Sequence, residues 1–296
     1  MIDKIISGFF AVVTAILSLF YTPSPITQVN PSEIPEAKIT QDLTVMTYNV
    51  DIKGTGSGSP ESRTPLVVEK ILSYMPDSFG LEEANEGWVE RLSTELADNY
   101  AYVGVGRDRD LGGEASPVFY LKNKYELLDS GTFWLSKTPE KPSRGWDAMF
   151  NRVCTYAVLK DKETGFTYAH FNAHFDHLGV IARQESIAVI TRKIAEIAPS
   201  IPVVFSGDLN DDEGTPMYNR AVESGLKDTK FLAETADSGK TYHGNLGGSN
   251  EGSPIDFIFT NGYVHSVSSY TIDREQINGM YTSDHHPVIV ELTLFN

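Results

Sequence analysis

Carboxylate, amide and imidazole side chains recur in this sequence beside short apolar runs. A polar group at the end of an apolar run is typical of a buried strand that leads into a loop, where functional groups collect on a rigid scaffold. Burying several carboxylates together costs free energy unless a cation neutralises them, and oxygen ligands suit Mg²⁺, Mn²⁺ or Ca²⁺ better than Zn²⁺. The groups placed in this way are Asn49 in TVMTYNV, Glu83 in SFGLEEAN, Asn172, His174, Asp176 and His177 in FTYAHFNAHFDH, Asp208 and Asn210 in VVFSGDLN, Asp256 in SPIDFIFT, and Asp284 and His285 in TSDHHPVIVEL.

Each of these groups also has an ordinary structural explanation. Asn49 can form a turn at a strand end, Glu83 can favour a helix N-terminus, and Asp208 with Asn210 can form a turn. A turn at Gly179 explains His177 in the same way. Several such pieces in one chain, with histidines beside Asp or Asn, favour a divalent-cation site over coincidence.

The elements that must position these groups are many strands with a few helices between them. Apolar residues at helical spacing predict helices over 64–74, 88–96 and 181–197. Strand-like runs cover 43–50, 78–82, 100–105, 118–121, 127–135, 153–159, 167–175, 203–206, 257–260, 263–270 and 287–294. This mixture predicts a layered α/β fold, and two packed sheets flanked by helices would account for the number of strands.

The N-terminal region differs in composition from the rest of the chain. Residues 5–21 are almost entirely apolar and follow Lys4, which is typical of a signal peptide or an N-terminal membrane anchor. Four prolines follow among polar residues, so the next stretch is expected to be extended, with little to bury. We therefore predict a signal peptide or anchor over 1–22, a Pro-rich linker over 23–38 and one globular domain over 39–296, secreted or held at the outer face of a membrane.

The composition makes some classes of site and partner less favourable than others. With 41% hydrophobic and 22% charged residues, the chain is globular and not disordered. With a formal net charge of −16, the chain repels polyanions at long range and lacks the excess of positive charge typical of a nucleic-acid-binding protein. Cys154 is the only cysteine, which rules out an intrachain disulfide and argues against a Cys/His zinc site.

Taken in order, the segments TYN, LEE, NAHFDH, SGDLN, IDFIF and SDHHPV resemble the endonuclease/exonuclease/phosphatase superfamily over residues 42–295. The stretches GGEASPVFY, GTFWLS, GWDAMFNR and HFDHLGVIAR resemble a bacterial branch near the deadenylase type. The resemblance implies a four-layered α/β sandwich, with two packed mixed β-sheets flanked by helices and the active site at one end of the sheets. It also implies a phosphoesterase that uses Mg²⁺, with Mn²⁺ as the alternative ion.

The resemblance implies a role for each matching residue. Metal ligands are expected at Asn49, Glu83 and Asp284. Catalytic groups are expected at His174, Asp208, Asn210, Asp256 and His285, with Asp256 orienting His285 as general base and Asp208 as the alternative base. Asn172 would contact the scissile phosphate, and a protonated His174 would stabilise the pentavalent state. Glu114, Asp176 and His177 would lie nearby.

Three further residues carry open alternatives. Arg152 and Arg183 would either clamp substrate phosphate or pair with local carboxylates. Glu82 stands where family members usually have Gln, so its carboxylate would either add negative charge to the site or face solvent.

These expectations favour a phosphomono- or phosphodiesterase that acts outside the cytoplasm as a monomeric catalytic domain, with membrane association through the N-terminus. Small phosphorylated molecules and lipid head groups rank above nucleic acid as substrates, because of the charge of −16. An extracellular nuclease of the same superfamily is the rival function. A catalytically inert binding protein on this scaffold is the alternative from another class.

Overall fold

A computed structural model describes residues 21–30, 36, 39–54, 58–108, 110, 112–244 and 250–296. The helices are α2 (Pro60–Tyr74), α3 (Glu86–Glu95), α4 (Val180–Ile197) and α5 (Pro216–Glu223), with a 3₁₀ helix η1 (Thr229–Phe231). The strands are β1 (Thr40–Asn49), β2 (Ser78–Glu82), β3 (Tyr100–Val103), β4 (Val118–Leu121), β5 (Tyr125–Trp134), β6 (Val153–Asp161), β7 (Thr167–His174), β8 (Val203–Asp208), β9 (Lys227–Asp228), β10 (Ala233–Ala236), β11 (Asp256–Thr260), β12 (Val264–Ile272) and β13 (Val288–Phe295).

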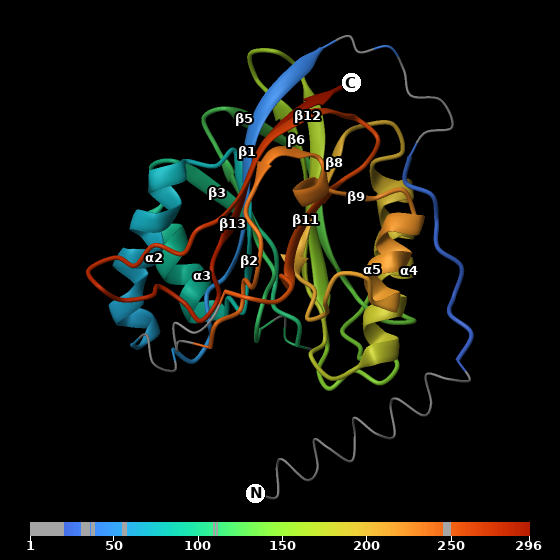
Figure 1. Ribbon diagram of the computed structural model, residues 1–296, viewed down its shortest axis with the longest axis horizontal. Coiled ribbons are helices and arrows are strands. Elements are labelled where there is room, and N and C mark those ends of the chain that lie inside the picture. The colour runs from blue at the N-terminus through green and yellow to red at the C-terminus, as the bar shows by residue number, and fades with distance from the viewer. Residues whose placement is uncertain are drawn as a thin grey trace, which may run out of the picture.

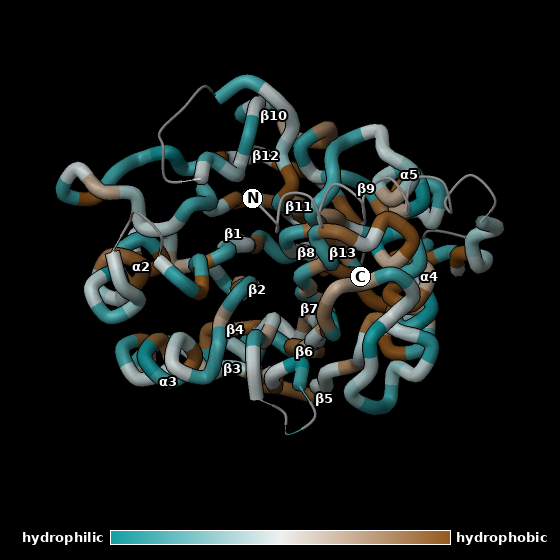
Figure 2. Tube along the Cα trace, turned by 90° about the horizontal axis from the view of Figure 1, so that it is seen from below, coloured by the Kyte–Doolittle hydropathy of each residue, from teal (hydrophilic) through white to brown (hydrophobic). Residues whose placement is uncertain are grey.

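The strands form two mixed sheets that pack face to face. One has seven strands in the order β10-β12-β13-β1-β2-β4-β3, and the other has six in the order β5-β6-β7-β8-β11-β9. Helices α2 and α3 cover the outer face of the first sheet, while α4 and α5 cover the outer face of the second (Figure 1; Figure 2 shows the same arrangement from below). This confirms the predicted four-layered α/β sandwich.

Three apolar clusters hold the four layers together. Val45 on β1 points between the sheets and packs with Val204 and Ile258. The next residue, Met46, points to the opposite face, as the alternation of a strand requires, and joins the cluster under α2 and α3. A third cluster fills the space between the second sheet and helices α4 and α5. Because central strands are buried on both faces, their sequences are nearly continuous apolar runs.

Strand direction brings the polar strand ends to one end of the sandwich. β1 and β2 are parallel, and so are β7 and β8, so that Asn49, Glu82, His174 and Asp208 all lie at carboxyl ends of strands. β11 runs antiparallel to β8 with Asp256 opposite Asp208, which places the first residue of β11 at the same end. The fold therefore gathers groups from five strands.

The stretch before the domain is partly ordered against it. Residues 21–30 form no helix or strand, but Val29 is buried, and its N–H donates to the carbonyl of Ser224. Ser24 donates its N–H to the buried carboxylate of Glu185 on α4 at 2.7 Å. The expectation that this part of the linker has little to bury is wrong, because its backbone bonds fix it along α4 and α5.

The predicted signal peptide or anchor over 1–22 lies outside the described residues, apart from its last two. None of the helices in the described part of the chain is long and apolar enough to cross a membrane.

Candidate active site

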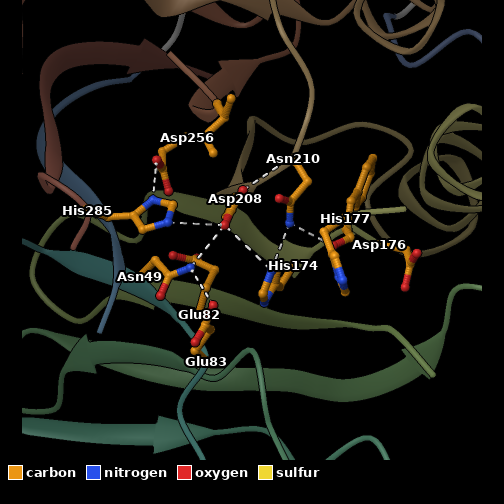
Figure 3. A network of polar contacts seen from close by, with 12 residues as sticks. Asn49, Glu82, Glu83, His174, Asp176, His177, Asp208, Asn210, Asp256 and His285 are labelled. Atoms are coloured by element: carbon orange, nitrogen blue, oxygen red, sulfur yellow. Dashed lines mark hydrogen bonds and ion pairs between the residues drawn. The ribbon is translucent and has the colours of Figure 1, made fainter. Parts of the chain in front are cut away.

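Asp208, at the end of β8, is the hub of the polar network (Figure 3). Its Oδ2 accepts a hydrogen bond from Asn49 Nδ2 at 2.9 Å and lies 3.5 Å from His174 Nε2 and 3.8 Å from His285 Nε2. Its Oδ1 accepts the N–H of Asn210 at 2.9 Å. Burial raises the pKa of Asp208 to about 7, and the charge of Asp256 adds to the effect. Residues from four separate predicted motifs therefore meet at one carboxylate.

The backbone around this hub takes conformations that most residues avoid. Glu83, Asn210 and Asp51 have φ of 58°, 50° and 53°, in the left-handed region. Gly207, just before Asp208, has φ of 149°, and a Cβ there would lie 1.9 Å from the carbonyl oxygen of Ala173 on β7. Strain of this kind persists only where surrounding structure fixes it, and it is common at functional sites.

His285 and Asp256 form a buried pair. His285 Nδ1 lies 2.8 Å from Asp256 Oδ2, which leaves Nε2 directed toward Asp208. Burial alone would lower the pKa of His285, but the charges of Asp256, Asp208 and Asp284 raise it to about 10. The predicted dyad geometry is therefore present, and the imidazole is protonated at neutral pH while these carboxylates carry their charge.

A cavity of about 550 Å³ opens beside this network. Its lining divides into two parts with different chemistry. We call Asp51, Glu83 and Asp284 the carboxylate half, and Glu114, Phe150, Arg152 and His177 the arginine half. His174, Asp208, Asn210 and His285 lie around the centre (Figure 3), and Ile52, Lys53, Tyr242 and Ile255 complete the lining.

The carboxylate half concentrates negative charge. Glu83 Oε1 accepts from Asn49 Nδ2 at 3.3 Å, and Glu83 Oε2 accepts the N–H of Ile52 at 3.0 Å. The buried Asp51 Oδ2 has no hydrogen-bond partner within the described ranges. Burial raises the pKa of Asp284 to about 6, and the charges of Asp51 and Glu83 add to it although His285 opposes them. Repulsion among three carboxylates is what a bound cation would relieve, so these oxygen donors fit Mg²⁺ or Mn²⁺.

A second set of donors lies deeper. Three possible ligand atoms lie within 4.8 Å of one another, one each from Asp208, Asp256 and His285. Because Asp256 Oδ2 is already used by His285 Nδ1 at 2.8 Å, we assign these two residues to the dyad. Asp208 remains free to face either the cation or the imidazole.

Buried Arg63 fixes the loops that carry the carboxylate half. Its guanidinium donates to the carbonyls of Val50, Asp51 and Thr282 at 2.6, 2.5 and 2.9 Å. One side chain therefore ties the segment after β1 to the segment before His285, and so holds Asp51 and Asp284 near each other.

In the arginine half, arginines and carboxylates are paired with one another. Arg107 donates two hydrogen bonds to the carboxylate of Glu114, of 2.7 and 2.9 Å. Arg152 lies 3.5 Å from Asp176 through Nε and 3.2 Å from His177 Nδ1 through Nη2. Burial and the charge of Arg152 lower the pKa of His177. Of the two alternatives for Arg152, the structure places it both beside local carboxylates and on the cavity wall.

His174 sits at the boundary of the two halves. Its Nε2 lies 2.9 Å from Asn210 Nδ2, and Asn210 also donates to the carbonyl of Phe175 at 3.0 Å. Burial, with the charges of Arg152 and Arg107, holds the pKa of His174 well below its usual range. Burial and the cationic neighbours therefore both favour the neutral imidazole over the protonated form that was expected for His174.

Asn172 does not lie where the resemblance implied. Its Nδ2 donates to the carbonyl of Leu81 at 3.0 Å, and its Oδ1 accepts from Ser206 Oγ at 2.7 Å. Gly80 leaves the room for it, since a Cβ there would lie 2.1 Å from Asn172 Cγ. The expected contact with substrate phosphate is not supported by this position, because the amide is fully buried and links the two sheets.

Arg183 and Asp176 are also absent from the cavity wall. Arg183 Nε donates to Asp211 Oδ2 at 2.9 Å, and its Nη1 donates to the carbonyl of Asp176 at 3.0 Å. This is the alternative in which Arg183 pairs with a local carboxylate. Asp176 Oδ1 accepts the N–H groups of Leu178 and Gly179, so it fixes the turn before α4.

Glu82 is buried and does not face solvent. Its Oε1 accepts from Thr47 Oγ1 at 2.9 Å. Burial, followed by the charge of Asp256, raises the pKa of Glu82 well above its usual range. A protonated Glu82 would present the donor and acceptor pair that an amide presents, which is compatible with the Gln that the resemblance implies at this position.

Several residues of the site were not predicted from the sequence, among them Asp51, Lys53 and Phe150 on the cavity wall and Arg107 behind it. Asp51 follows Asn49 by two positions and could have been found as a further carboxylate beside a strand end. Phe150 occurs within GWDAMFNR, but an exposed aromatic residue in a loop carries little signal of its own. Arg107 had no signal, because its role depends on its contact with Glu114.

Comparison with known proteins agrees with this geometry. The family model described as the Endonuclease/Exonuclease/phosphatase family matches residues 46–285. The chain belongs to this family. An endonuclease/exonuclease/phosphatase protein from Bacteroides vulgatus is 34% identical with a TM-score of 0.80, over 86% of this chain and 99% of that chain. A mannosyl-6-phosphatase from Bacteroides thetaiotaomicron is 32% identical with a TM-score of 0.78, over 84% of this chain and 99% of that chain.

A more distant relative supports the predicted branch of the family. Nocturnin from Xenopus laevis is 24% identical over 226 residues, which are 67% of this chain and 56% of that protein. The solved catalytic domain of human Nocturnin shares the fold with a TM-score of 0.66. These matches confirm the predicted family and its bacterial branch near the deadenylase type. The chain is a hydrolase of phosphate esters, from a family whose enzymes generally depend on a divalent metal.

Proposed function

We propose that this protein is a Mg²⁺-dependent phosphatase that releases inorganic phosphate from small phosphorylated molecules, with sugar monophosphates as the leading candidates. The observation that carries the proposal is the convergence of Glu83, Asp208 and His285 on one cavity. Similarity to a mannosyl-6-phosphatase over 84% of this chain supports the sugar. The net charge of −16 supports a small substrate over a polynucleotide.

Different residues of the chain would hold the cation, take up a proton and align the attacking water. Glu83, Asn49 and Asp284 would hold the cation, with Asp51 beside them. When bound, the cation would neutralise these carboxylates and polarise a phosphoryl oxygen. Because these carboxylate charges raise the pKa of His285, their neutralisation would favour its neutral form, and Nε2 could then take a proton from an attacking water. Asp256 keeps the imidazole in the required tautomer through Nδ1, and Asp208 aligns the water on the other side.

Inorganic phosphate release tests this proposal directly. The purified protein would be stripped of metal with EDTA and assayed for phosphate release from mannose 6-phosphate and glycerol 3-phosphate. In parallel, p-nitrophenol release from bis-p-nitrophenyl phosphate and shortening of an oligonucleotide on a gel would measure diester cleavage. We expect turnover of the monoesters only after Mg²⁺ or Mn²⁺ is restored. Asp208→Asn should abolish it, while Asp212→Asn, an exposed residue four positions away, should not. Preferential cleavage of the oligonucleotide would favour the nuclease, and no turnover of any ester would favour an inert scaffold.

We also propose that the enzyme acts outside the cytoplasm, with residues 1–22 as its export signal or anchor. The apolar run over 5–21 supports this location. Cell fractionation would place full-length protein outside the cytoplasm or at the membrane, and deletion of residues 2–22 should leave it in the cytoplasm. Cytoplasmic full-length protein would contradict the proposal.

A further inference from the structure

The arginine half of the cavity holds a hydrogen-bond donor that the network leaves unused. Arg152 is buried, and its Nη1 has no hydrogen-bond partner in the described part of the chain. Glu114 Oε2 lies 3.9 Å from Nη1, which is too long for a hydrogen bond. Leaving such a donor unsatisfied costs free energy. Nη1 itself has almost no exposed surface, so an acceptor on a ligand completes it when the guanidinium, which lines the cavity, turns slightly toward that ligand.

An apolar ring stands next to this donor. Phe150 lines the same cavity and keeps 43% of its surface exposed. Its backbone is held in place, since its N–H donates to Asp176 Oδ2 at 3.2 Å. The Arg107 guanidinium lies 4.7 Å from its centroid, and the His177 ring is stacked at 6.0 Å. A fixed apolar face beside an unused donor suits a ligand that has both C–H surface and hydroxyl groups.

The charges in this region cancel. Two guanidinium groups, on Arg107 and Arg152, face two carboxylates, on Glu114 and Asp176. A second phosphate needs an excess of positive charge, and a polynucleotide needs several such contacts along its backbone. A balanced network supplies no such excess, so the region suits an uncharged group.

We propose that the arginine half is the leaving-group subsite and selects a neutral, hydroxyl-rich ring, as in a monophosphorylated sugar. Phe150 packs against the C–H face of the ring, and Arg152 donates Nη1 to one of its hydroxyl groups. This inference rests on the proposed phosphatase activity and adds specificity to it. Phe150 and Arg152 thereby set which alcohol departs, while the groups around Asp208 act on the phosphate.

A matched pair of variants tests the role of Phe150. Phe150→Ala and Met149→Ala remove neighbouring exposed side chains, of which only Phe150 lines the cavity. Phosphate release would be measured with mannose 6-phosphate, which has a ring, and glycerol 3-phosphate, which has none. We expect Phe150→Ala to raise KM for mannose 6-phosphate about tenfold with little change in kcat. KM for glycerol 3-phosphate should change less than about twofold, and Met149→Ala should change neither.

The second arm tests charge and hydrogen bonding. Arg152→Lys keeps the charge but loses the guanidinium geometry, so it should raise KM for the sugar more than for glycerol 3-phosphate. Wild-type enzyme should prefer fructose 6-phosphate to fructose 1,6-bisphosphate. Equal losses of Phe150→Ala on both substrates, or preference for the bisphosphate or for an oligonucleotide, would overturn the subsite. Absence of turnover of every ester by the wild type would instead refute the proposed function.

Discussion

The two halves of the cavity differ in whether their carboxylates have cationic side chains as partners. In the arginine half, each carboxylate has a guanidinium within reach, as in the bonds of 2.7 and 2.9 Å between Arg107 and Glu114. In the carboxylate half, Asp51, Glu83 and Asp284 face a cavity that Lys53 also lines, with Arg63 behind them, but none of the three forms an ion pair among the described residues. The pKa of Asp284 is raised to about 6 by burial, and its acidic neighbours add to the effect. A region that balances its own charge can recognise a neutral group, whereas a region that does not must import a cation.

The His285–Asp256 pair between the halves should be the most sensitive point. We expect His285→Ala to lower kcat/KM about 1,000-fold, because it removes the group that takes the proton. Phosphate release with saturating Mg²⁺ measures this. His265→Ala, an exposed histidine on β12, is the matched control and should retain wild-type activity. Activity of His285→Ala within about threefold of wild type would remove His285 from the mechanism.

The next largest effect should come from the carboxylate half itself. Glu83→Gln keeps the shape of the side chain but removes its charge, so the Mg²⁺ concentration for half-maximal activity should rise about 10- to 100-fold. The activation curve by Mg²⁺ and by Mn²⁺ measures this shift. Glu86→Gln, in the first turn of α3 and away from the cavity, should leave the curve unchanged. An unchanged curve for Glu83→Gln would place the cation elsewhere.

A smaller effect should appear in the stability of the metal-free protein. Burial raises the pKa of Asp284 to about 6 and that of Asp208 to about 7, so the folded state binds these protons more tightly than the unfolded state. The contribution of these two carboxyl groups to the free energy of unfolding should therefore fall as the pH rises from about 4 to 7. The raised pKa of His285 has the same sign, with its stabilisation present below about pH 6.5 and lost as the pH passes through about 10. Buried histidines whose pKa is lowered, such as His243 and His286, contribute with the opposite sign up to about pH 6.5.

Melting temperatures in EDTA at pH 5 and pH 7.5 would measure this slope. The change in melting temperature from pH 5 to pH 7.5 should be a few degrees less favourable in the wild type than in Asp284→Asn, on the scale of about 2–4 °C per kcal/mol. Mg²⁺ should restore part of this difference at pH 7.5. An identical slope in Asp284→Asn would mean that this carboxyl group is not the source.

The smallest effect on activity should come from Arg183, which the structure places away from the cavity. Arg183→Gln loses the bonds to Asp211 and to the carbonyl of Asp176, and should lower the free energy of unfolding by about 1–3 kcal/mol. Its kcat/KM should stay within about threefold of wild type. Urea unfolding and phosphate release measure the two quantities separately. A large rise in KM without loss of stability would return Arg183 to the substrate site.

The strands could be predicted because central strands of this sandwich are buried on both faces. Ser78–Glu82 and Val118–Leu121 form strands with the predicted bounds. The missed elements lack such a pattern: β10 (Ala233–Ala236) is mostly exposed, and α5 has only eight residues. Helix α2 begins four residues before the predicted start, because its first turn is polar and is signalled by the Ser59 cap and Pro60 instead.

The site residues that stand at strand ends could be predicted from the sequence. Those whose position depends on the path of a loop, or on how far they lie from the end of a strand, could not. Asn172 and His174 share one face of β7, as residues two apart must. Asn172 lies two residues before His174, which ends β7. Its side chain therefore reaches the carbonyl of Leu81 on the facing sheet, while the side chain of His174 reaches the cavity. Asp51 and Phe150 depend on the paths of their loops, which no strand pattern encodes.

Crystallography with Mn²⁺ would test most directly whether the carboxylate half holds the cation. Crystals grown with Mn²⁺ should show an anomalous peak within about 2.0–2.3 Å of a Glu83 carboxylate oxygen, with Asp51 and Asp284 beside it. The same crystals soaked with EDTA should lose that peak. An anomalous map with no peak in the cavity, from protein whose phosphate release needs Mn²⁺, would contradict the assignment.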